Sequence, residues 1–118
     1  MSVQATTSAP PTLGDPALAE VVRRLAEAYR PERIYLFGSL ARGEPDPDSD
    51  YDLMVIVSDD APPECHRSRL AYQVLRGTGA AADVLVWSKS SFERRLHVVA
   101  SLPATIAREG ILLYASRS

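Results

Sequence analysis

The chain has 118 residues, a formal net charge of −2 and an ordinary hydrophobic content, so it is long enough for one small domain with a modest core. The slightly acidic balance argues against a general nucleic-acid binder, which usually presents a basic face. One cysteine, Cys65, excludes an internal disulfide framework. No apolar run reaches membrane-spanning length and no signal-peptide core is present, so we expect a cytoplasmic location and no membrane partner.

The first third of the chain predicts a tail, a helix and a strand. Residues 1–13 are rich in Ser, Thr, Pro and Ala and are expected to be a disordered tail, whereas residues 14–118 are expected to form the domain. Asp15 caps a helix that begins at Pro16. Arg33 to Phe37 is nearly continuously apolar, which predicts a central strand. The buried stripe of the helix is predicted from apolar residues at helical spacing: Leu18, Val21, Val22, Leu25 and Tyr29.

The remaining elements alternate between strands and helices. We predict strands over residues 50–57 and 82–87, with a helix over residues 64–76 between them. A short closing strand is expected over residues 111–114.

The segment between the third strand and the closing strand predicts two helices. Ser90 and Glu93 have the spacing of a capping box for the first of them, and Pro103 separates it from a second helix that runs to Gly110. The side chains expected to face inward are Phe92, Leu96, Val99 and Leu102.

Two aspartates at the start of the second predicted strand point to metal chemistry. Side chains alternate along a strand, so Asp50 and Asp52 are expected on one face, roughly 6–7 Å apart. Two carboxylates at that spacing can hold one Mg²⁺, or clamp two metals together with phosphate oxygens. Tyr51 and Leu53 are expected to face the opposite way, toward packing.

A glycine turn follows the first predicted strand. Gly38 allows the backbone to come close to a bulky anion, and Ser39 adds a hydroxyl donor. Arg42 can add a charge-assisted contact. Together with the aspartates, this turn predicts a site for the phosphates of a nucleotide and a divalent metal.

Two competing motifs fail on the same residues. A P-loop needs Lys and then Ser or Thr after its second glycine, where this chain has Glu44 and Pro45. The alternating aspartates from Asp46 start like an EF-hand loop, but Tyr51 stands at the glycine position and Val57 at the bidentate glutamate position. Neither motif is therefore assigned.

Gly38-Ser39, Arg42-Gly43 and the run Ser49-Asp50-Tyr51-Asp52-Leu53 resemble the nucleotidyltransferase signature of the DNA polymerase beta superfamily. Within it, the chain is similar to the small bacterial group of minimal nucleotidyltransferases (MNT), over roughly residues 15–115. The resemblance implies an α/β (α+β) fold, with a small mixed β-sheet flanked by helices.

The resemblance also implies a third carboxylate on a later strand. Asp83 leads the apolar run Val84 to Trp87 and matches that position. A buried aspartate is costly unless a donor or a metal pairs with it. The implied catalytic and Mg²⁺-binding residues are Asp50, Asp52 and Asp83, and the implied nucleotide-binding residues are Gly38, Ser39, Arg42 and Ser49.

By the same resemblance, the donor is ATP and the activity is transfer of AMP to a hydroxyl. Members of the group often pair with a small helical HEPN toxin and attach AMP to a tyrosine of it, thereby acting as antitoxins. The chain is too short for a second, acceptor-gripping domain, so the acceptor surface is expected from a partner in a hetero-oligomer or homo-oligomer. Two alternatives stay open: a non-catalytic antitoxin that neutralises its partner by binding alone, and transfer to a small molecule such as an aminoglycoside.

Overall fold

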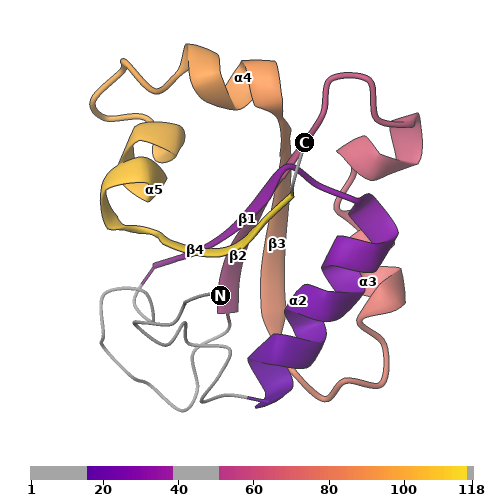
Figure 1. Ribbon diagram of the computed structural model, residues 1–118. Coiled ribbons are helices and arrows are strands. Elements are labelled where there is room, and N and C mark those ends of the chain that lie inside the picture. The colour runs from indigo at the N-terminus through magenta and orange to yellow at the C-terminus, as the bar shows by residue number, and fades with distance from the viewer. Residues whose placement is uncertain (1–15, 39–50, 117–118) are drawn as a thin grey trace, which may run out of the picture.

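The computed structural model describes residues 16–38 and 51–116 and contains a four-stranded mixed sheet in the order β3-β2-β1-β4 (Figure 1). The central strand β1 pairs antiparallel with β2 and with β4, and β2 pairs parallel with β3. The elements in chain order are α2 (Pro16–Tyr29), β1 (Arg33–Phe37), β2 (Tyr51–Val57), the 3-10 helix η2 (Pro63–His66), α3 (Arg69–Val74), β3 (Ala82–Ser88), α4 (Lys89–Arg94), α5 (Leu102–Glu109) and β4 (Ile111–Ala115). The predicted fold class, a small mixed sheet with flanking helices, is confirmed.

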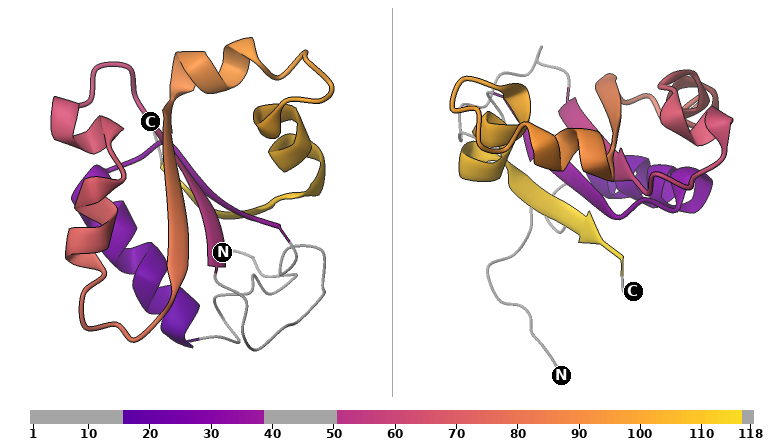
Figure 2. Two further views of the ribbon diagram at one scale, coloured as in Figure 1. Left: turned by 180° about the vertical axis from the view of Figure 1, so that it is seen from behind. Right: turned by 90° about the horizontal axis from the view of Figure 1, so that it is seen from above.

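Helices cover both faces of the sheet, with α2 and α3 on one face and α4 and α5 on the other (Figures 1 and 2). In β2, the run Leu53–Val57 is buried without a break because its side chains point alternately into two cores. Leu53, Val55 and Val57 pack toward α2 and α3. Met54 and Ile56 pack toward Phe92 of α4 and Ile106 of α5. Among the described residues, no helix is long and apolar enough to span a bilayer.

Helix α2 buries the predicted apolar stripe and is tied to α3 by polar contacts. Its five buried residues are the five predicted from helical spacing. The buried Tyr29 hydroxyl donates to the carbonyl of Arg67 and accepts from the backbone N–H of Ala71 at 2.9 Å. Arg24 donates to the carbonyls of Val74 and Arg76 at 3.0 and 2.9 Å. These bonds satisfy carbonyls near both ends of α3 and hold that short helix against α2.

The predicted helix over residues 64–76 is instead split into η2 and α3. Arg67 caps η2 with φ −123° and ψ 144°, an extended conformation that interrupts the helical path. The α3 segment then has only six residues. Its position depends on the contacts with α2, because a helix this short is not stable alone.

The predicted capping box at Ser90 and Glu93 is wrong. Ser88 is the N-cap of α4, and its side chain accepts from the N–H of Ser91. Because α4 ends at Arg94, the helical spacing that would turn Leu96 and Val99 inward is lost. Those two side chains are 39% and 76% exposed, contrary to the prediction that they face the core.

Candidate functional site

Two of the predicted carboxylates lie side by side in the sheet. Asp52 of β2 and Asp83 of β3 are direct partners in the parallel register, and neighbouring strands are about 4.8 Å apart. Leu53 and Val84, the residues that follow the two aspartates, face α2 and α3. Side chains of neighbouring residues in a strand point to opposite faces of the sheet. The two aspartates therefore share the opposite face of the sheet, at the end where β2 and β3 begin.

Gly38 directly follows β1, the strand on the other side of Asp52. Phe37 is the antiparallel partner of Asp52, and Gly38 follows it with a φ of +81°. A Cβ built on Gly38 would overlap Oδ2 of Asp52. Glycine is needed here both for the left-handed backbone and for the space that the carboxylate occupies. The prediction that Gly38 lets the backbone approach a bulky anion stays a prediction; the described group beside Gly38 is the side chain of Asp52.

Asp83 is exposed rather than buried. The sheet order makes β3 an edge strand. A side chain of α3 reaches the first residues of this strand. The Tyr72 hydroxyl donates to Oδ1 of Asp83 at 3.3 Å. The expectation that burial makes this aspartate costly is therefore wrong, because water and a phenol solvate the carboxylate. Sequence reasoning missed Tyr72, since nothing in the pattern of α3 separates it from an ordinary surface aromatic.

The residues present fit a divalent cation. Two carboxylates in register on one face repel each other unless a cation neutralises them, and carboxylate oxygens are the ligands that Mg²⁺ takes in proteins. Within residues 16–38 and 51–116, no group of three His, Cys, Asp or Glu side chains gathers at one point. Of the seven predicted site residues, the structure brings together Gly38, Asp52 and Asp83, whereas Ser39, Arg42, Ser49 and Asp50 lie outside the described residues.

The nucleotidyltransferase domain model matches residues 18–113, which is most of the chain. The chain belongs to the nucleotidyltransferase domain family. That match spans Gly38, Asp52 and Asp83, so the paired carboxylates lie inside the family domain. No curated protein is similar enough in sequence to be matched.

Solved structures show the same fold. A proposed nucleotidyltransferase from Sulfolobus solfataricus superposes with a TM-score of 0.57 at 19% identity, over 85% of this chain and 78% of that one. A toxin–antitoxin structure with AMP-PNP superposes with a TM-score of 0.54 at 20% identity, over 83% of this chain and 73% of that one. At these identities the likeness concerns the fold, and the family assignment rests on the domain match.

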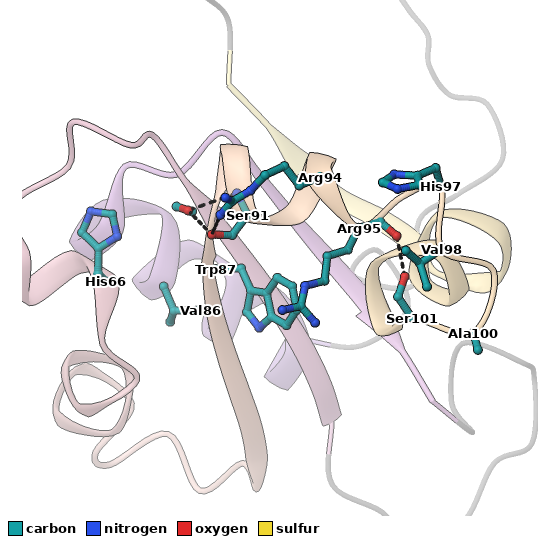
Figure 3. Close-up of a pocket in the computed structure, with 11 residues that line it drawn as sticks. His66, Val86, Trp87, Ser91, Arg94, Arg95, His97, Val98, Ala100 and Ser101 are labelled. Atoms are coloured by element: carbon teal, nitrogen blue, oxygen red, sulfur yellow. Dashed lines mark hydrogen bonds between the residues drawn. The ribbon is translucent and has the colours of Figure 1, made fainter.

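A hollow lies toward the other end of β3, about 13 Å along the strand from Asp83 at the usual rise per residue. Its volume is about 870 Å³ (Figure 3). The Arg95 guanidinium lies over the Trp87 ring, 5.6 Å from the ring centroid. The lining comprises His66, Val86, Trp87, Ser88, Ser91, Arg94, Arg95, His97, Val98, Ala100 and Ser101. None of these is acidic and two are arginines, in contrast to the aspartate pair.

Proposed function

We propose that the chain is a protein adenylyltransferase that moves AMP from ATP to a hydroxyl of a partner protein. The observation that carries the proposal is the in-register pair of Asp52 and Asp83 beside Gly38, inside the matched nucleotidyltransferase domain. Two carboxylates on one face, next to a glycine with a left-handed backbone, form an arrangement suited to a triphosphate with its cation.

Each site residue has a chemical role in this proposal. Asp50, Asp52 and Asp83 hold Mg²⁺, which when bound supplies positive charge against the phosphates. Gly38 and Ser39 position the β- and γ-phosphates through the backbone and the hydroxyl, with Arg42 and Ser49 as further donors.

The transfer itself is an in-line displacement. The acceptor oxygen attacks the α-phosphorus, the bond from that phosphorus to the bridging oxygen breaks, and pyrophosphate leaves. Asp83 receives the proton of the attacking hydroxyl; its Oδ1 already accepts a hydrogen bond from a phenol, that of Tyr72. Most of the rate then comes from positioning and charge stabilisation.

The acceptor in this proposal is a tyrosine of a HEPN toxin, and the chain acts as its antitoxin. One point supports it: one structure with this fold is a toxin–antitoxin structure with AMP-PNP. The partner would then supply the acceptor surface and form a hetero-oligomer with the chain.

The test is intact-mass spectrometry of the chain co-expressed with the protein encoded by the adjacent gene, after addition of Mg²⁺ and ATP. We expect one or more adenylyl groups on the partner. Asp50→Asn combined with Asp52→Asn should lower the rate at least about a hundredfold, since even the outer partners of metal ligands are worth 10–100-fold. The charge-matched control is Asp59→Asn with Asp60→Asn, two exposed aspartates in the turn after β2.

The control pair should transfer at the normal rate, and circular dichroism should show that both variants remain folded. Normal transfer by the folded Asp50→Asn, Asp52→Asn chain would contradict the proposal. An unmodified partner that co-purifies and is neutralised equally by both variants would instead identify an antitoxin that acts by contact alone.

A further inference from the structure

Tyr72 is the one exposed tyrosine of the chain. The chain has five tyrosines, all within the described residues, and the side chains of Tyr29, Tyr35, Tyr51 and Tyr114 are buried or half-buried. Tyr72 is 49% exposed on α3, although its ring is large and apolar.

The hydroxyl of Tyr72 lies at the proposed catalytic carboxylate. Its oxygen is 3.3 Å from Oδ1 of Asp83, in a hydrogen bond between two exposed groups. Such a bond contributes little to stability, because water competes for both partners. It does place a phenolic hydroxyl beside a base, which is the arrangement needed to activate an oxygen nucleophile.

Hydrogen bonds from α2 hold the helix that carries Tyr72 in place. Tyr29 and Arg24 of α2 bond to backbone groups at both ends of α3, at Arg67, Ala71, Val74 and Arg76. The phenol is therefore held near Asp83 by a docked helix rather than by a loop, so little ordering is needed to bring the two groups together.

We propose that Tyr72 is itself an acceptor, so that the chain adenylylates its own α3. Oη of Tyr72 attacks the α-phosphorus of ATP and passes its proton to Oδ1 of Asp83. The bond from the α-phosphorus to the bridging oxygen breaks and pyrophosphate leaves. The product is a phosphodiester between Tyr72 and AMP. This inference rests on the proposed function, because it uses the same site and the same donor.

The experiment uses the full chain without a partner, incubated with Mg²⁺ and ATP. Intact-mass spectrometry is expected to show one adenylyl group per chain, and peptide mapping is expected to place it on Tyr72. Tyr72→Phe should remain unmodified. The matched control is Tyr114→Phe, the same loss of one oxygen on β4, the strand at the opposite edge of the sheet, and this variant should be modified normally.

A second readout does not depend on transfer. With Mg²⁺ and α,β-methylene-ATP, which cannot release pyrophosphate, a nucleotide seated beside Asp83 should shield Tyr72. Nitration of Tyr72 by tetranitromethane should then slow severalfold relative to the free chain. An unchanged nitration rate would contradict a nucleotide site within reach of Tyr72.

The outcomes separate this inference from the proposed function. If the partner protein is adenylylated while Tyr72 stays unmodified, the inference is overturned and the proposed function stands. If the adenylyl group appears on another residue, or persists in Tyr72→Phe, the inference is also overturned. If neither protein is modified and no pyrophosphate is released, both proposals fail.

Discussion

The two ends of β3 differ in charge and in construction. At its start, Asp83 lies beside Asp52 and near Gly38, positions set by strand register and by one backbone conformation. Toward its other end, Trp87, Arg94 and Arg95 line a basic hollow built from half-buried side chains of η2 and β3 and from mostly exposed side chains of α4 and the turns after it. The aspartate pair at the acidic end thus depends on backbone geometry that tolerates little change. The hollow at the basic end depends on long side chains, which can be substituted without changing the backbone. Substitutions at each end should reveal this difference.

The largest effect is expected at Gly38, where the acidic end meets β1. In Gly38→Ala, the Cβ would overlap Oδ2 of Asp52 and an L-residue would have to adopt a φ of +81°. Strain of this kind costs about 1–3 kcal/mol. We expect a lower free energy of unfolding in urea, and loss of nucleotidyl transfer because the carboxylate is displaced. The control is Gly77→Ala, which has a φ of +83° but no atom within 4 Å of its Cβ.

Gly77→Ala should lose stability through its backbone alone and keep its transfer activity. Equal transfer by Gly38→Ala and the native chain would show that the contact between Gly38 and Asp52 does not determine the site.

The second effect, on stability, is expected at Tyr29, which holds α3 and thereby Tyr72 near the acidic end. Tyr29→Phe removes a buried hydroxyl that donates to the Arg67 carbonyl and accepts from the Ala71 N–H. Loss of buried hydrogen bonds of this kind costs about 1–3 kcal/mol, which urea unfolding would measure. Tyr35→Phe is the control, because the Tyr35 hydroxyl has one long, exposed bond, from Arg33 at 3.4 Å.

The buried hydroxyl of Tyr29 also predicts that the stability of the fold depends on pH. Burial raises the pKa of Tyr29 above its ordinary value of 10.0. The unfolded chain therefore loses this proton at a lower pH than the folded chain, and stability falls as the pH rises above about 10. Tyr29→Phe should show a weaker decline than the native chain over that range. An identical decline in both chains would show that Tyr29 does not contribute to it.

The smallest effect is expected at the basic end. Arg95→Ala removes a cation–π contact with Trp87 that is worth about 0.5–1 kcal/mol at an exposed site. Self-transfer to Tyr72, measured by intact mass, should be unchanged because the aspartate pair lies at the other end of the strand. Arg67→Ala, an exposed arginine outside the basic hollow, is the control for loss of charge. A fall in self-transfer with Arg95→Ala alone would show that the two ends are coupled.

Much of the fold could be predicted from the sequence. Each of the four strands lies within two residues of its predicted range, since continuous apolar runs between turn residues mark buried strands. The helices after β2 were harder, because short elements that are held by tertiary contacts carry weak local signals. The split between η2 and α3 and the early end of α4 at Arg94 depend on such contacts.

The sequence alone determined the candidate chemistry: aspartates at alternating positions beside a Gly-Ser turn, and a third aspartate at the start of a later strand. Residues two apart in a strand lie on the same face, so local spacing alone predicts that the alternating aspartates share a face. Only the tertiary structure decided that Asp83 pairs in register with Asp52 and that Tyr72 reaches Asp83. It also decided that His66 and Ser101, which are far apart in the chain, line the same basic hollow. Those facts depend on which strands are neighbours and how helices dock, and contacts between distant segments leave no periodic pattern in the chain.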